Sequence, residues 1–293
     1  MPVEFLKGPH LRLFLGAVLI SLSPVWVKLV SVSPTTSGFY RVAIGSVTVA
    51  VLMVFARQKL RLSKRAWFLV ALAGAFFSLD LFFWHRSIIY VGPGLSTLLA
   101  NFQVFIMMSA GVVLLRQKPS KMQMLAVPLA LLGLVMIVGL DWQSLPDDYR
   151  LGIIFGLLTA IMYAGYLLSL RAARVDSENR LPLAEVAVVS IVCTLLLVVI
   201  AQAEGVSLAV PDSADIKWLL CYGILSHSFG ALLLASSLPH VSTTEAGLAL
   251  LLQPTLSFVW DVLFFGRPMQ AIEIAGAAIA LIAIYLGARV RGQ

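Results

Sequence analysis

The chain has 293 residues, of which 60% are hydrophobic and 12% are charged, and its mean hydropathy is +0.97. Soluble globular proteins are about 45–50% apolar and about 25% charged, so this composition argues against a soluble enzyme or binding domain. The net charge of +7 comes from short basic clusters between apolar runs, which is typical of membrane topology and not of a nucleic-acid-binding face. Cys193 and Cys221 lie within apolar runs and predict neither a disulfide framework nor a metal site.

Apolar runs of about 20 residues, long enough to cross a bilayer, recur along the whole chain. The first has no A-x-A cleavage site and is interpreted as a transmembrane helix, not as a removed signal peptide. Runs of this length must be helical, because lipid cannot satisfy a bare backbone and barrel strands are shorter. The sequence therefore predicts an all-α membrane protein with ten transmembrane helices, at 11–30, 37–56, 67–89, 95–115, 123–140, 151–170, 183–202, 218–238, 244–265 and 271–288.

The distribution of lysine and arginine predicts the orientation. With the N-terminus in the cytoplasm, fifteen basic residues fall on the inside: Lys7, Arg12, Arg57, Lys59, Arg61, Lys64, Arg65, Arg116, Lys118, Lys121, Arg171, Arg174, Arg180, Arg289 and Arg291. Three fall in outside loops: Arg150, Lys217 and Arg267. Because cytoplasmic loops are enriched in Lys and Arg, we expect a multi-pass protein of the bacterial inner membrane with both termini cytoplasmic.

The two halves of the chain resemble each other. The segment "GAVLISLSPVWVKL" from Gly16 aligns with "GLLTAIMYAGYLLSL" from Gly156, and a second pair of segments places Gln103 on Gln253. Each half holds five predicted spans, and an odd number makes the second half cross the membrane in the opposite sense. The sequence therefore predicts two inverted five-helix repeats, 1–145 and 146–293, an arrangement common among transporters.

Three segments carry a resemblance to a known family: "FYRVAIG" at 39–45, "LLANFQVFIMM" at 98–108 and "LALLLQPTLSFVWDVLFFGRP" at 248–268. With the five-plus-five layout, they resemble the drug/metabolite transporter superfamily, in its EamA-like branch of ten-helix bacterial permeases. The resemblance implies a secondary carrier, often an exporter, of amino acids or other small metabolites. Family members often have a glutamate where this chain has Gln117 and Arg267, so any role of that acid is absent here.

Ionised side chains near the centre of a membrane span cost roughly 2.5–3.5 kcal/mol on insertion scales, and they usually face a cavity and have partners. At about 1.5 Å per residue, Asp80 and His227 lie near the midplane of their spans, whereas Lys28, Arg41 and Asp261 lie on the order of 10 Å toward the outside. Asp80 is interpreted either as an acid that pairs with a cation or takes a coupling proton, or as a structural contact between helices. We expect it inside the bundle, with Lys28, Arg41 or His227 as its partner.

The other polar candidates keep two interpretations each. Lys28 and Arg41 either line the solute pathway or extend to the outer headgroups. His227 either exchanges protons or bonds a neighbouring helix. His85 is interpreted either as a proton relay or as an interfacial histidine, and Arg86 is interpreted as extending to the headgroups. Both are expected at the outer end, within reach of water and headgroups. Pro254 frees the carbonyl of residue 250 and predicts either a gating hinge or a static kink.

Aromatic side chains within spans suggest an apolar-walled cavity with a few polar anchors, or simple core packing. Together these patterns predict a set of substrate-binding residues, with Pro254 as the gating residue: Trp26, Lys28, Arg41, Asp80, Trp84, Asn101, Gln103, Tyr163, Tyr166, His227 and Gln253.

No P-loop, GxGxxG, HExxH or GxSxG motif is present in the sequence, so we expect no catalytic residue, cofactor or metal. The favoured function is a secondary-active transporter, with export expected, of a small metabolite such as an amino acid, by alternating access. Its partners would be a small-molecule solute, the lipid bilayer and a coupling proton, with no nucleic acid and no prediction of oligomeric state. The alternatives are an intramembrane enzyme and a passive channel.

Overall fold

The computed structural model describes residues 8–60, 62–116, 119–138, 142–173, 183–209, 212–237, 240 and 243–288, and these ranges contain helices and no strand. The helices are α1 (Pro9–Ser21), α2 (Ser23–Leu29), α3 (Pro34–Phe55), α4 (Lys64–Ala100), α5 (Gln103–Leu115), α6 (Lys121–Val138), η1 (Trp142–Ser144), α7 (Asp147–Ala173), α8 (Leu183–Ala203), α9 (Ser213–Cys221), η2 (Tyr222–Gly230), α10 (Ala231–Ser237), α11 (Thr243–Phe265) and α12 (Ala271–Ala288). The predicted all-α fold is confirmed.

Seven helical segments among the described residues are long and apolar enough to cross a membrane, and two shorter ones, Leu251–Phe265 and Ala271–Leu286, are also apolar. The expected span 67–89 and most of the expected span 95–115 fall within one apolar segment, Lys64–Val113, whose backbone leaves helical geometry at Gly92. The chain is therefore a multi-pass helical membrane protein. The count of ten spans, their inverted relation and the division at residue 145 stay predictions.

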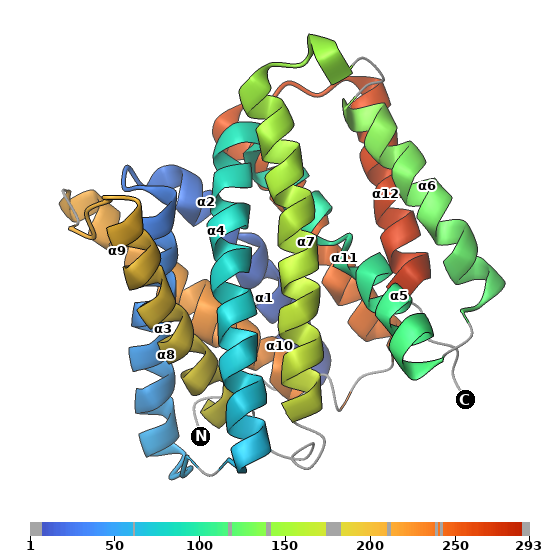
Figure 1. Cartoon of the computed structure of the whole chain (residues 1–293). Coiled ribbons are helices and arrows are strands. Elements are labelled where there is room, and N and C mark those ends of the chain that lie inside the picture. The colour runs from blue at the N-terminus through green and yellow to red at the C-terminus, as the bar shows by residue number, and fades with distance from the viewer. Residues whose placement is uncertain are drawn as a thin grey trace.

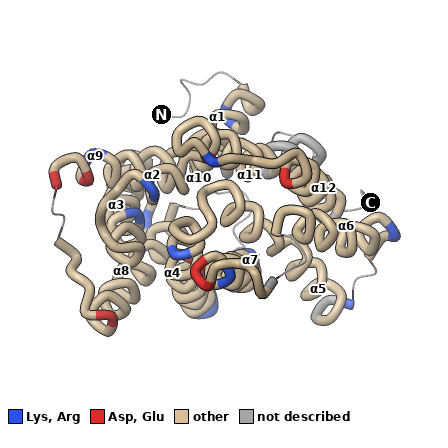
Figure 2. Tube along the Cα trace, turned by 90° about the horizontal axis from the view of Figure 1, so that it is seen from above, with Lys and Arg blue, Asp and Glu red and all other residues tan. Residues whose placement is uncertain are grey.

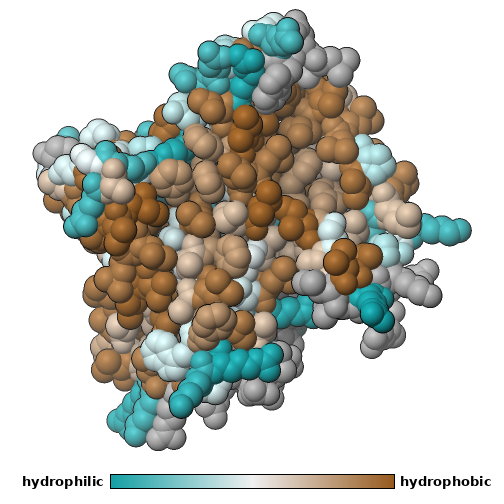
Figure 3. All heavy atoms as spheres, in the orientation of Figure 1, coloured by the Kyte–Doolittle hydropathy of each residue, from teal (hydrophilic) through white to brown (hydrophobic). Residues whose placement is uncertain are grey.

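The surface agrees with a membrane environment. Large apolar side chains such as Phe55 and Phe68 are 78% and 68% exposed, which would be costly over a wide area in water. Hydrophobic residues cover the middle of the face drawn in Figure 3, and hydrophilic residues gather at its upper and lower ends. The outward-facing apolar belt is what a lipid-exposed helix bundle requires.

The first and second halves of the chain interlock. α4 runs beside α7, α6 beside α12, and α3 beside α8, so each of these pairs joins one half to the other (Figure 1). At the α6–α12 contact, a β-carbon on Gly133 would stand 2.6 Å from the carbonyl oxygen of Gly276, so small residues permit this close approach. The halves are thus not separate packed bodies, and most of the core lies between them.

The two largest hydrophobic clusters among the described residues fill most of the bundle. One lies around α4, α6, α7 and α12 and includes Leu98, Leu99 and Ala280. The other lies among α3, α4, α8 and η2 and includes Phe77, Trp84 and Tyr222. The second cluster contains the polar side chains from which the candidate site is built.

Several spans are interrupted by their own sequence. The backbone of Gly92 adopts φ 85° and ψ 165° directly before Pro93, a conformation that glycine permits at little cost. Asn101 and Phe102 form a turn between α4 and α5, and the segment η2 is a π-helix. Interrupted helices in membrane proteins are tolerated where protein or a water-filled space surrounds them, and π-helical segments often mark functional sites.

Candidate functional site

One face of α3 organises the candidate site. Gly38, Arg41 and Gly45 stand three and four residues apart and therefore share that face. A β-carbon on Gly38 would lie 3.2 Å from Cε1 of His85, and one on Gly45 would lie 2.1 Å from Cδ2 of His227. The two glycines thus admit the two imidazole rings, one on each side of Arg41 along the helix.

The guanidinium of Arg41 is surrounded by aromatic rings. Its Cζ lies 5.5 Å from the ring centre of Phe77, 5.6 Å from that of Trp84 and 4.9 Å from that of Tyr222. Nη1 donates a hydrogen bond of 2.8 Å to the Tyr222 hydroxyl, whereas the buried Nε has no hydrogen-bond partner in the part of the chain that the structure describes. Cation–π contacts stabilise the charge inside the bundle, and the unused N–H remains available to an acceptor.

Asp80 is 5% exposed, so the prediction that it lies inside the bundle is confirmed. Within the described ranges its carboxylate makes no hydrogen bond and no ion pair, and Arg41 is the charged group that acts on it electrostatically. Lys28 is not its partner. A buried carboxylate without a hydrogen bond is rare in proteins and is a candidate for binding a proton or a cationic group.

Tyr163 and Tyr166 of α7 form a wall beside these charges. Their rings stack with centres 5.5 Å apart, and Tyr166 packs on Phe77 at 4.9 Å. Asp80 acts electrostatically on both tyrosines. The predicted stripe on α7 is therefore brought to the same place as the polar residues of α3 and α4.

His227 lies at the other end of this group. Its Nε2 is 3.0 Å from the hydroxyl of Ser190 on α8, and its ring stacks on Phe77 with centres 6.0 Å apart. We call the assembled set the Arg41 cluster: Arg41, Phe77, Asp80, Trp84, Tyr163, Tyr166, Tyr222 and His227. It combines one cation, one anion and one imidazole with aromatic walls, inside a membrane bundle.

His85 and Arg86 differ from each other in the structure. His85 is 0% exposed, so the expectation that water and headgroups reach it is wrong. The first turn of α3 covers it, because Nδ1 lies 2.9 Å from the carbonyl oxygen of Pro34. Arg86 instead forms an ion pair with Glu204 and bonds Thr35 Oγ1 at 3.0 Å.

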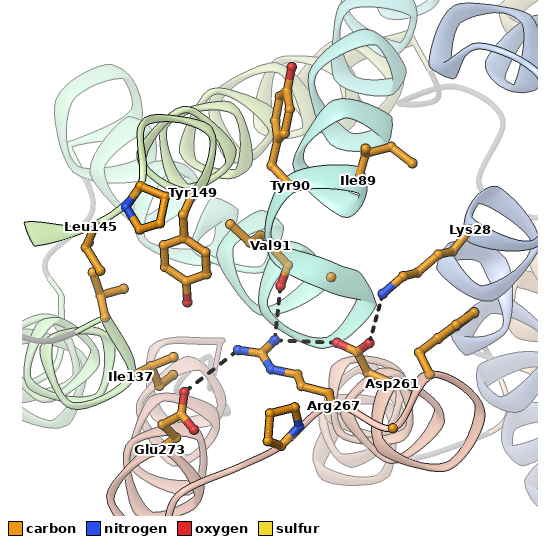
Figure 4. A pocket seen from close by; sticks show the side chains of 16 residues that line it. Lys28, Ile89, Tyr90, Val91, Ile137, Leu145, Tyr149, Asp261, Arg267 and Glu273 are labelled. Atoms are coloured by element: carbon orange, nitrogen blue, oxygen red, sulfur yellow. Dashed lines mark hydrogen bonds and ion pairs between the residues drawn. The ribbon is translucent and has the colours of Figure 1, made fainter.

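A pocket of about 600 Å³ lies apart from the Arg41 cluster, at the end of the bundle that carries the 266–270 connection, which we call the upper end. Of the predicted site residues, only Lys28 lines it. Figure 4 shows Lys28 pointing toward Asp261, with Nζ 3.7 Å from Oδ1. Arg267 Nη1 lies 3.4 Å from Asp261 Oδ2 and donates to the Val91 carbonyl at 3.1 Å. Lys28 is therefore an ion-pair partner of Asp261.

Seen from above, the Lys, Arg, Asp and Glu residues lie mostly at the rim and the connections of the bundle (Figure 2). The Asp261 side chain is buried, at 0% exposure. Its Oδ2 also accepts a hydrogen bond of 3.1 Å from the backbone N–H of Gly94. Asp261 thereby joins α11 to the break in α4.

The remaining predicted residues lie outside the Arg41 cluster. Trp26 donates to Ser226 Oγ at 3.0 Å and stacks on Trp218. Asn101 Nδ2 donates to the Thr97 carbonyl at 2.8 Å, which uses the amide within its own helix end. Two glutamines and the predicted gating proline have no described contact with the cluster: Gln103, whose Oε1 is buried without a partner, Gln253, and Pro254, which is buried within α11.

Sequence reasoning missed three members of these sites. Phe77 stands three residues before Asp80 on α4, so extending the face of Asp80 backward would have found it. The signal for Tyr222 was weaker, because the sequence showed only that it is an aromatic residue in the same predicted span as His227. Asp261 was placed at the depth of Lys28, but its burial and its contact with Arg267 had no signal in the sequence.

Comparisons with known proteins agree with this architecture. The model of the EamA-like transporter family matches residues 9–139 and 150–288, which together cover most of the chain. Proteins described as "Uncharacterized inner membrane transporter YhbE", from Escherichia coli K12, Escherichia coli O157:H7 and Shigella flexneri, are 27% identical over 271 residues, covering 87% of this chain and 81% of the relative. One solved crystal structure of a protein has a TM-score of 0.68 at 14% identity, covering 95% of this chain and 96% of that chain. This last likeness concerns the fold alone.

Proposed function

Because the chain belongs to the EamA-like transporter family, we propose that it is a secondary-active carrier of a small organic solute, with the Arg41 cluster as its solute-binding site. One observation carries this proposal. Among the described residues, the buried Nε of Arg41 has no hydrogen-bond partner, and Arg41 acts electrostatically on Asp80, whose carboxylate has no hydrogen bond there either. Buried polar groups are normally hydrogen-bonded, so a donor and an acceptor without partners in one cluster fit a ligand that supplies both.

The chemistry of the cluster favours a solute that carries an anionic and a cationic group. A guanidinium binds carboxylates strongly, and a carboxylate such as Asp80 binds an ammonium group. The rings of Trp84, Tyr163 and Tyr166 offer an apolar wall for the rest of the solute, as in other small-molecule sites. An amino acid or amino-acid-like metabolite meets these requirements.

Energy for transport would come from a proton or solute gradient. We assign the coupling role to Asp80 and His227, because both side chains are buried and titratable. Both also belong to the Arg41 cluster, in which the His227 ring stacks on Phe77. The halves would rock around the cluster in alternating access, as in other carriers with repeated halves. We place the carrier in the bacterial inner membrane with both termini cytoplasmic, supported by the basic-residue bias and by the description of the YhbE relatives. Export is proposed as its direction from the resemblance to EamA-like permeases alone.

Flux measurements in proteoliposomes test this function. We would load vesicles with each member of a panel of radiolabelled L-amino acids and follow counterflow and saturation. Saturable counterflow supports a carrier, flux that does not saturate would indicate a channel, and chemically altered solute would indicate an enzyme. Absence of any flux across the panel would overturn the amino-acid class.

Variants locate the solute site. Arg41→Gln removes the charge within the aromatic rings and should raise KM about tenfold or more, because hydrogen bonds to charged groups contribute roughly 1.5–3 kcal/mol. Arg150→Gln is the matched control, since Arg150 forms a surface ion pair with the largely exposed Asp147. Equal kinetics of the two variants would remove Arg41 from the solute site.

A further inference from the structure

Four groups from three helices form a single chain of hydrogen bonds that ends at Arg41. The Pro34 carbonyl lies 2.9 Å from His85 Nδ1, His85 Nε2 lies 2.9 Å from the Tyr222 hydroxyl, and that hydroxyl accepts the Arg41 Nη1–H at 2.8 Å. The members come from the first turn of α3, from α4, from the start of η2 and from the middle of α3. The chain of hydrogen bonds therefore holds one guanidinium edge of Arg41, a residue of α3, against two other elements, α4 and η2.

The roles of donor and acceptor in this chain follow from its chemistry. A carbonyl oxygen only accepts, so His85 Nδ1 must carry the proton. Nε2 of a neutral imidazole is then an acceptor, and the Tyr222 O–H donates to it. The tyrosine oxygen keeps its lone pairs for Arg41. Each bond thus has one direction, and all of them are satisfied when the imidazole is neutral.

Neither His85 nor Tyr222 is available to a solute. Both are 0% exposed, and the His85 ring is held against Gly38 on α3. Arg41 is only partly buried, its Nε has no partner among the described residues, and it acts electrostatically on Asp80. The bond to Tyr222 therefore uses one guanidinium nitrogen and leaves the others to face the solute site.

We propose that His85 and Tyr222 are positioning residues, which fix the Arg41 guanidinium so that its free N–H groups meet an anionic group of the solute. This role rests on the proposed function of the Arg41 cluster. The orientation is set before the solute arrives, because a preorganised donor lowers the entropic cost of binding. Without this chain of hydrogen bonds, the flexible Arg41 side chain would move among its aromatic neighbours and would bind anions more weakly.

The first test observes the chain of hydrogen bonds directly, in protein without any solute. The described residues include four histidines, of which His85 is assigned by comparison with His85→Gln, and ring-nitrogen NMR of labelled histidine distinguishes the tautomers. We expect a neutral ring protonated at Nδ1, with an Nε2 signal that shifts in Tyr222→Phe. A ring protonated at Nε2, or at both nitrogens, would overturn the inference whatever the transport result.

The second test measures KM and maximal rate with the labelled L-amino acid panel. Tyr222→Phe keeps the ring over Arg41 and removes the hydroxyl, so KM should rise about tenfold with little change in maximal rate. Tyr40→Phe is the matched control. It also removes one tyrosine hydroxyl and its hydrogen bond, here to the Leu208 carbonyl at 2.9 Å, and this bond does not involve the Arg41 side chain. His85→Gln keeps an acceptor near the position of Nε2 and should retain more affinity than His85→Asn.

The outcomes separate this inference from the proposed function. If Arg41→Gln abolishes transport while Tyr222→Phe keeps the wild-type KM, the positioning role is wrong and the solute site stands. If Tyr222→Phe and Tyr40→Phe lower the maximal rate equally, the hydroxyl of Tyr222 serves only packing, and the inference is again overturned. If Arg41→Gln transports as wild type does, the proposed site fails and this role fails with it.

Discussion

A β-carbon on Gly92 would stand 2.6 Å from Oδ2 of Asp261, so the break in α4 and the buried carboxylate of α11 are mutually dependent. Glycine is needed at residue 92 for two reasons, the positive φ of 85° and this contact. The Asp261 carboxylate in turn accepts the Gly94 N–H two residues later. The upper end of the bundle is thus joined at one point where α4, α11 and the Arg267 side chain meet.

Gly92→Ala should destabilise the protein by about 2 kcal/mol or more. A non-glycine residue in this region of positive φ and extended ψ costs roughly 1–3 kcal/mol, and the contact with Asp261 adds to this cost. Thermal unfolding of the purified protein in detergent measures the effect. Gly205→Ala is the control, since Gly205 has φ 66° but no atom within 4 Å of its β-carbon position. If Gly92→Ala and Gly205→Ala lose the same stability, the Asp261 carboxylate can move away from the added methyl group without an energetic cost.

Asp261→Asn should cost about 3–5 kcal/mol of stability, because it leaves the side chains of Lys28 and Arg267 without their buried anion. Unfolding in detergent mixtures checks this loss. Asp147→Asn, in a largely exposed ion pair with Arg150, should change stability very little. Combining Asp261→Asn with Lys28→Met should recover part of the loss, and a fully additive double variant would contradict the coupling.

Asp80→Asn should leave membrane insertion and folding intact while transport is lost or no longer depends on pH. Asparagine has nearly the same shape as aspartate and removes only the charge and the titratable proton. Flux measured over a range of pH at equal protein amount tests this expectation. Asp212→Asn is the control, because Asp212 caps α9 at the surface. A flux–pH profile like that of the wild type would make Asp80 a structural contact.

Pro254→Ala should reduce transport without reducing membrane insertion. The substitution restores a backbone donor within α11 and stiffens a helix that packs on both α1 and α4. Pro128→Ala provides the comparison, since Pro128 also lies inside a helix, α6. If both variants transport at the wild-type rate, Pro254 is a static feature of α11.

The burial of Asp80 and the approximate ranges of most helices were predictable from the sequence, because long apolar runs indicate spans and a charge at their centre usually faces the bundle interior. Direction around the helix axis was harder to predict. Lys28 and Arg41 were assigned the same depth, yet Lys28 pairs with Asp261, whereas Arg41 bonds Tyr222 and acts electrostatically on Asp80. Which neighbour a side chain meets depends on packing between helices distant in sequence.

His85 gives the second reason for a wrong prediction. Its place near the end of an apolar run suggested contact with water. The helical segment continues beyond that run through Val91, and the start of α3 lies over the histidine. An apolar run marks where lipid contact is possible, but it does not mark where the protein surface begins.

The π-helix η2 has a consequence for how this chain is compared with its relatives. Residues five apart diverge by about 140° around an α-helix, but the wider turn of a π-helix brings them much nearer to the same face. Tyr222 and His227 are five apart, and both belong to the Arg41 cluster. The segment therefore behaves as an α-helix into which one extra residue has been inserted. A relative with an unbroken α-helix would keep the same two side chains in place with one residue fewer, so an alignment that allows no gap here would match the wrong pairs beyond it.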